Sequence, residues 1–194
     1  NGEVLDKKTP LLNSSLALNK QALRILNLLQ FKCGRVRSVV GAEQEYFLIK
    51  KSLFDKRRDL VYTGRTLFGA EPCKGQESDG HYFRPPTDDV LAFMRDVDDE
   101  LWKLGIIVKT EHNEVAPCQC ELAPCYSDAN DACNQNQLIM ETLKNTAEKH
   151  GLKCLLHEKP FDKINGSGKH NNWSLLTDYD ENLLEAGNTP KENA

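Results

Sequence analysis

Residues 35–49 read RVRSVVGAEQEYFLI, a run rich in valine, tyrosine, phenylalanine and isoleucine. Side chains of these kinds suit a pleated, half-buried surface, so the run predicts a β-strand. Gly41 lies inside it, and a glycine within a strand often marks a bulge. We therefore expect a strand that is broken or bulged at Gly41, and the fold class depends on the elements around it.

The flanking sequence alternates helical and extended patterns. Apolar residues recur near helical spacing in three segments, 13–30, 87–104 and 129–150. Gly105 and Gly151 are expected to end the second and third helices. Strand-like runs occupy 106–117, 119–124 and 152–157, whereas glycine and proline punctuate 52–86, which predicts loop with short pieces of structure. Strands and helices that alternate predict an α+β or α/β fold rather than an all-α fold.

Composition limits the class of protein. The chain has 194 residues, 39% hydrophobic and 28% charged, which suits one sizeable domain or part of a larger one. A net charge of −4 argues against a general nucleic-acid binder. No apolar run approaches the roughly 20 residues of a membrane helix, so we expect no membrane association. The first methionine is Met94 and the C-terminal residues resemble an interrupted loop, so we expect an internal fragment of a longer chain.

Seven cysteines without a secretion signal predict free thiols in a reducing cytosol, and thus a cytoplasmic protein. Three of them, Cys118, Cys120 and Cys125, lie close together in sequence and raise the hypothesis of a structural zinc module. Their spacing is not a C-x₂-C pair and no H-x₃₋₅-H follows. Small buried or half-buried side chains are the alternative interpretation.

Acidic residues form the first candidate site. Glu43 and Glu45 are two apart in the predicted strand, so their side chains share a face, with Cα atoms about 6.6 Å apart. Phe47 and Ile49 share that face, which indicates an interior surface where two carboxylates are costly unless a positive group lies between them. A solvated acidic face on an edge strand is the alternative.

A predicted turn around VAPCQC separates Glu114 from Glu121, and a hairpin there would bring these carboxylates together. Alone they would be two acids on a surface hairpin. Together with Glu43, Glu45 and His170 they make four carboxylates and one imidazole, a donor set that suits Mg²⁺ or Mn²⁺ better than zinc. Such ions commonly neutralise phosphate groups during transfer.

The segment NGSGKH, residues 165–170, predicts a tight loop whose backbone can approach a ligand closely. The phosphate-loop pattern G-x-x-x-x-G-K-[ST] is not met, because a histidine follows Lys169. His170 stands directly after the loop; a structural role with satisfied hydrogen bonds is the alternative for it.

Three segments in this order resemble one family: GAEQEYFLI (41–49), EHNEVAPCQCELAP (111–124) and HEKPFDKINGSGKHNNWSL (157–175). The family is glutamine synthetase, in its long type III form, and the resemblance covers essentially the whole chain. It implies that residues 1–194 are the N-terminal part of a catalytic domain with an α+β fold, in which helices flank a curved antiparallel sheet.

The resemblance implies the metal ligands. Glu45, Glu114 and Glu121 match the ligands of a first divalent ion, Mg²⁺ or Mn²⁺, and Glu43 and His170 match two ligands of a second. It also implies catalytic roles for Glu45, Glu114 and His170.

Substrate residues follow in the same way. Asn165, Gly166 and His170 match contacts to glutamate, and Asn172 and Ser174 match the segment that lies along ATP. The implied activity is a glutamate–ammonia ligase that makes glutamine through γ-glutamyl phosphate, in a cytoplasmic homo-oligomer. Another carboxylate–amine ligase of the same superfamily is the alternative.

The sequence departs from the type III pattern in APCQCELAP, which has cysteines where relatives usually carry a small residue and a histidine. The resemblance also implies that later arginines, the last metal glutamate and a shielding flap would follow Ala194. We therefore expect residues 1–194 alone to be inactive.

Overall fold

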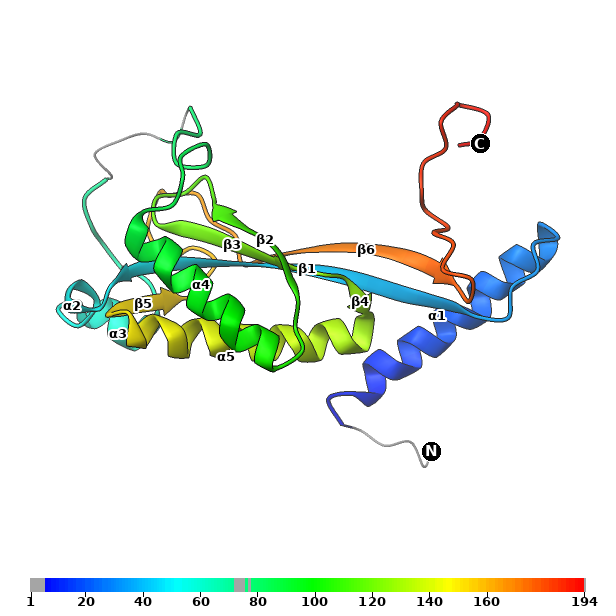
Figure 1. Cartoon of the computed structure of the whole chain (residues 1–194), viewed down its shortest axis with the longest axis horizontal. Helices are drawn as coiled ribbons and strands as arrows, with labels where there is room; N and C mark the ends of the chain where they lie inside the picture. Colours follow the sequence, from blue (N-terminus) through cyan, green and yellow to red (C-terminus); the bar gives the residue numbers. More distant parts are fainter. Residues whose placement is uncertain (1–5, 72–75, 77, 194) are drawn as a thin grey trace. The chain divides into compact units, whose positions relative to one another are not determined.

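The computed structural model describes residues 6–71, 76 and 78–193. These residues divide into two compact units. The first holds the residues up to 40, residues 126–133 and those from 172 onward, and the second holds 41–125 and 134–171. Within the described residues six strands belong to one sheet whose recorded registers are antiparallel, and helices accompany it (Figure 1). The α+β class expected from the sequence is confirmed.

The central strand is β1, Val36–Lys50, which runs through both units. In the second unit β1 pairs with β3 (Gln119–Pro124) on one side and with β5 (Leu152–Leu155) on the other. Strand β2 (Val108–Asn113) pairs with β3. The expected break at Gly41 is not present: β1 is continuous over 15 residues, because strand partners lie on both sides of the glycine.

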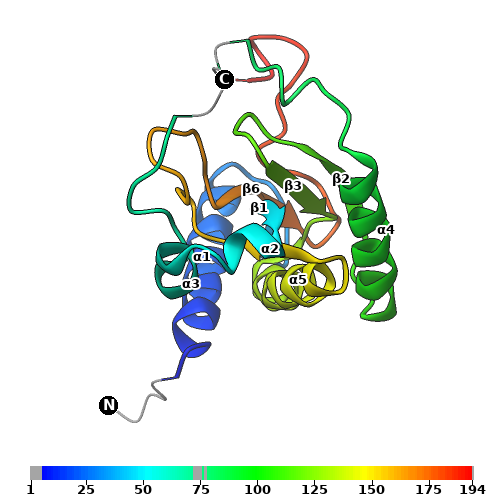
Figure 2. The same ribbon diagram turned by 90° about the vertical axis from the view of Figure 1, so that its left-hand side faces the viewer.

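One face of this sheet carries the main core of the second unit. Tyr46 and Leu48 of β1 pack with apolar residues of α4 (Asp88–Lys103) and of α5 (Ala129–Lys149). Figure 2 shows these two helices next to the strands of this unit. The two helices end as the sequence predicts, because Gly105 and Gly151 adopt left-handed φ angles of 75° and 66°. This face is therefore the apolar side of β1.

The opposite face carries a smaller cluster around Phe47, which packs with Leu155 and Ile164. Two short helices, α2 (Lys51–Phe54) and α3 (Arg58–Thr63), add Phe54 and Leu60 to it. They are the short pieces of structure expected within 52–86. Glu43 and Glu45 alternate with the core residues and so belong to the Phe47 face.

In the first unit, α1 spans Thr9–Leu28 and begins four residues before the predicted start at Asn13. The Asp6 carboxylate accepts hydrogen bonds from the amides of Lys8 and Thr9 (2.8 and 2.6 Å), and Pro10 suits the first turn. The apolar pattern alone did not reveal this start.

Two strands were not predicted as such. Strand β4 (Ser127–Asp128) pairs with the first part of β1, and β6 (Lys169–Thr177) also pairs with β1.

In the first unit Arg37 forms ion pairs with Asp128 and Asp180. No helix in the described part of the chain is long and apolar enough to cross a membrane.

Candidate metal centre

Strand β1 supplies the first two carboxylates, and both lie on the face that Phe47 shares, as their spacing predicts. Glu45 is only 2% exposed, whereas Glu43 is half-buried. Because β1 pairs with β3, Glu45 stands directly opposite Glu121 in the register. The sheet therefore brings a third carboxylate to the same face.

The β2–β3 hairpin supplies Glu114. The amide of Glu114 donates to the carbonyl of Gln119 (2.9 Å), and Cys118 takes a left-handed φ of 65° in the turn. His112 stands opposite Glu121 in the register of this hairpin. One donor atom each from His112, Glu114 and Glu121 lies within 4.8 Å of the others. The predicted approach of Glu114 to Glu121 is thus present.

The NGSG loop brings His170 to these acids. Its Nδ1 lies 3.2 Å from Oε1 of Glu45 and 3.5 Å from Oε2 of Glu43. A second donor group forms from Glu43, Glu121 and His170, again with donor atoms within 4.8 Å of one another. Glu121 is common to both groups.

Glu45 itself belongs to neither of these two groups. Its Oε2 accepts hydrogen bonds from Nε2 of Gln119 (2.6 Å) and from the Ser167 hydroxyl. Its Oε1 is buried and has no hydrogen-bond partner among the described residues. The structure therefore holds one oxygen of Glu45 in place and leaves the other, the one nearest His170, to face the site.

Sequence reasoning missed three of these residues: His112, Gln119 and Ser167. His112 lies two residues before Glu114, which directly follows β2, and Gln119 and Glu121 lie two apart on β3; residues two apart in an extended segment share a face. Their spacing in the sequence therefore indicated both His112 and Gln119 as candidate site residues. Ser167 had no such signal, because its contact with Glu45 spans 122 residues of sequence.

Burial and mutual repulsion both disfavour the charged forms of these carboxylates. Burial, with the charges of Glu43 and Glu114 adding to it and His112 opposing it, raises the pKa of Glu121 to about 7. Burial also raises the pKa of Glu114, with Glu45 adding to it, while the amide of Val115 lowers it. A cation bound between the carboxylates would favour their charged forms.

The residues present therefore fit a divalent ion. Four carboxylates supply oxygen donors, two imidazoles supply nitrogen, and Oε1 of Glu45 is a buried acceptor without a hydrogen bond. Hard divalent ions prefer such oxygen-rich sites. The two donor groups in the described residues contain no cysteine. Of the three clustered cysteines, Cys120 lies in the apolar core and Cys118 and Cys125 are exposed. Cys73 lies outside the described residues.

Gly166 allows the loop to pass close to its neighbours. A Cβ atom there would lie far inside the normal contact distance to the Glu158 carbonyl oxygen and 3.2 Å from Cζ of Phe47. The φ angle of Gly166 is not left-handed, so the requirement at this position is space.

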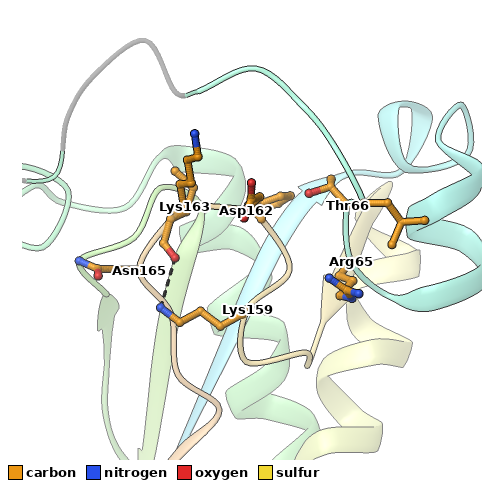
Figure 3. A pocket seen from close by; sticks show the side chains of 9 residues that line it. Arg65, Thr66, Lys159, Asp162, Lys163 and Asn165 are labelled. Carbon is orange, nitrogen blue, oxygen red and sulfur yellow. Dashed lines mark hydrogen bonds between the residues drawn. The ribbon is translucent and has the colours of Figure 1, made fainter.

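Asn165 precedes it and lines a neighbouring pocket of about 460 Å³ (Figure 3). Lys159 and Lys163 also line this pocket, but their ammonium groups bind different partners. Lys159 donates to the Ile164 carbonyl (3.3 Å), and Lys163 pairs with Glu71 (3.3 Å). These two lysines are therefore not directed at a single anion position.

The two remaining predicted residues, Asn172 and Ser174, lie on the part of β6 that belongs to the first unit. The Ser174 hydroxyl is hydrogen-bonded to the side chain of Asn182.

The sequence profile described as "Glutamine synthetase, catalytic domain" matches residues 20–193. The chain belongs to the glutamine synthetase family. The resemblance expected from the motifs is thus confirmed, and the carboxylate–imidazole cluster lies within the matched segment.

Glutamine synthetases of other organisms are similar to this chain in sequence. The chain is 54% identical to a glutamine synthetase of Butyrivibrio fibrisolvens over 193 residues, which are 99% of this chain and 27% of that protein. It is 50% identical to the type-3 glutamine synthetase of Dictyostelium discoideum over 194 residues, 100% of this chain and 26% of that protein. The chain thus spans about a quarter of the length of these relatives.

A solved structure supports the fold. The Plasmodium falciparum glutamine synthetase determined by cryo-electron microscopy superimposes with a TM-score of 0.59 at 19% identity, over 88% of this chain and 35% of that chain. At this identity the similarity shows the fold alone.

Proposed function

We propose that residues 1–194 are the N-terminal part of the catalytic domain of a glutamate–ammonia ligase, which makes glutamine from glutamate, ammonia and ATP. The observation that carries this proposal is the pair of overlapping donor groups that share Glu121, found in a chain of the glutamine synthetase family. The enzyme would be a cytoplasmic homo-oligomer.

The proposed ions are Mg²⁺ or Mn²⁺. Glu45, Glu114 and Glu121 would hold the first, and Glu43 and His170 would contribute to the second. The donor groups support this division in part, because Glu114 and Glu121 fall in one group and Glu43 and His170 in the other. Bound there, such ions would offset the negative charge of the reacting carboxylate and phosphate groups.

The proposed substrate roles are those that the sequence resemblance implies. Asn165, Gly166 and His170 would contact glutamate, and Asn172 and Ser174 would lie along ATP. A γ-carboxylate oxygen of glutamate would attack the γ-phosphorus of ATP, with ADP as leaving group. Ammonia nitrogen would then attack the γ-carbonyl carbon of γ-glutamyl phosphate, and phosphate would leave.

The chain's own residues would assist both steps. Gln119 and Ser167 hold the carboxylate of Glu45 in a fixed orientation through their hydrogen bonds. Because this carboxylate is already oriented, it would need little rearrangement when charge develops nearby during the reaction. Acidic side chains would favour ammonium over neutral ligands by charge, and a carboxylate beside the ammonium ion would help to remove its proton.

The test is ammonia-dependent formation of glutamine by the longer enzyme that contains this chain, with ATP and Mg²⁺ or Mn²⁺. Glutamine and ADP in equal amounts are expected. Cleavage of ATP that requires another amine or another acid in place of ammonia or glutamate would contradict the proposal. Because the chain spans a quarter of its relatives, we expect residues 1–194 alone to make no glutamine.

A further inference from the structure

Behind the acidic face of β1 lies a buried amide. Gln44 stands between Glu43 and Glu45, so its side chain points to the other face of the strand. It is 2% exposed. Its Nε2 donates to the carbonyls of Glu45 (2.7 Å) and Gly168 (2.9 Å). The Gly168 carbonyl also accepts from the Glu45 amide (3.2 Å), so Gln44 reinforces the junction between the loop and the strand.

Helix α5 supplies a second buried amide. Asn136 is 4% exposed, and its Nδ2 donates to Oε1 of Gln44 (3.4 Å). Its Oδ1 accepts a hydrogen bond from the ammonium group of Lys169. Lys169 directly follows Gly168 in the chain. The contacts therefore form a closed circuit that leaves the loop at Lys169, passes through Asn136 and Gln44, and returns at Gly168.

The chemistry of lysine fixes the direction of this circuit. An ammonium group only donates hydrogen bonds, so the Asn136 atom that faces Lys169 must be the oxygen. The nitrogen of Asn136 then faces Gln44, which must present its own oxygen there. Nε2 of Gln44 is left to face two carbonyls, which accept. Each bond in the circuit thus has one donor and one acceptor, with no alternative amide orientation.

We propose that Gln44, Asn136 and Lys169 form a positioning network that fixes the segment carrying His170 against β1 and thereby strengthens binding of the divalent ions. Gly168 at the end of the loop and Lys169 at the start of β6 immediately precede His170. Gln44 and Asn136 are buried and hydrogen-bonded, whereas Lys169 is exposed. Buried hydrogen-bonded side chains hold one geometry rigidly, and metal ligands depend on such support. The inference deepens the proposed function, since it rests on the ions of that site.

The test uses the longer enzyme and Mn²⁺ alone as the probe. Bound Mn²⁺ is measured by electron paramagnetic resonance, and hydrogen exchange of the peptide that contains residues 167–171 is measured without metal. Gln44→Met is expected to weaken Mn²⁺ binding by about 10-fold, as loss of a group that supports a ligand does. It should also speed exchange in this peptide, because the Gly168 carbonyl loses a donor. Gln137→Met is the matched control, since Gln137 is an exposed residue of α5.

Lys169 tests whether the three side chains act together. Lys169→Met should weaken Mn²⁺ binding in the same direction by about threefold, and Lys169→Arg should restore most of the loss because arginine also only donates. The double variant with Gln44→Met should bind no worse than Gln44→Met alone, since members of one network are not additive.

Several results would overturn the proposal. Variants that melt at a lower temperature but bind Mn²⁺ and exchange like the wild type would show a purely structural role. Fully additive losses would show two separate contacts. A wild-type enzyme that binds no Mn²⁺ would overturn the proposed function together with the network, whereas unchanged binding in Gln44→Met would overturn the network alone.

Discussion

Adding one methyl group to the NGSG loop tests how closely the loop must approach the sheet. In Gly166→Ala the new Cβ would clash with the backbone oxygen of Glu158, which cannot turn away as a side chain can, and would press on Phe47 at 3.2 Å. Restoring an ordinary contact requires the loop to move by about 1 Å. Inserting a methyl group into a packed site of this kind costs about 1–3 kcal/mol.

The same movement would displace Asn165 and His170. A misplacement of about 1 Å at a catalytic site can cost on the order of 10²-fold in rate. We therefore expect Gly166→Ala to lower kcat of glutamine formation by about 10- to 100-fold and to lower the melting temperature.

Gly168→Ala is the matched control, because a Cβ there meets only Cβ of Glu158 at 3.5 Å, an ordinary contact, and the carbonyl of residue 168 is retained. Its activity should stay within about threefold of the wild type. The assay is steady-state glutamine formation by the longer enzyme together with thermal unfolding. Equal effects of the two substitutions, or a Gly166→Ala enzyme as active as the wild type, would refute the spatial argument.

Three further predictions concern His170, Glu111 and the cysteines. His170→Ala should lower glutamine formation on the order of 10²-fold with an unchanged circular dichroism spectrum; loss of the folded spectrum would instead indicate a structural histidine. Burial, with the charge of Asp98 adding, raises the pKa of Glu111 from 4.5 to about 8, so the folded protein keeps a proton that the unfolded chain releases. Its contribution to stability therefore falls as pH rises from about 4.5 to about 8. Glu111→Gln should raise the free energy of unfolding at pH 8, on the order of 1–3 kcal/mol, and barely change it at pH 4.5, as urea titrations at both values would show; a larger gain at the lower pH would contradict the argument. Thiol titration of denatured, unreduced protein should find close to all seven cysteines reactive, whereas mostly blocked sulfur would contradict a reducing compartment.

Local spacing predicted much of the site. A strand period of two was enough to place Glu43 and Glu45 on one face, and a short turn was enough to bring Glu114 near Glu121. Contacts between distant segments were not predictable in this way. The register that sets His112 opposite Glu121 depends on how two strands align, and no local pattern specifies that alignment.

The fold shows the same division. The end of α4 followed from Gly105, but β6 begins with KHNNW, whose asparagines disfavour strands. Its strand conformation comes from pairing with β1, more than 100 residues earlier in the chain. The role of Gln44 was also not predictable from local sequence, because its hydrogen-bond partners Asn136 and Gly168 come from two other segments.

The central claim is that one carboxylate cluster holds the divalent ions of a glutamate–ammonia ligase. The most direct test is a Mn²⁺ titration of the longer enzyme and of Glu121→Gln, followed by electron paramagnetic resonance, because Glu121 belongs to both donor groups. Glu141→Gln, at an exposed carboxylate of α5, is the matched control. We expect Glu121→Gln to weaken Mn²⁺ binding by about 10-fold or more and the control to bind as the wild type does. If Glu121→Gln and the wild type gave the same binding curve, the cluster would not be the metal centre and the account would be wrong.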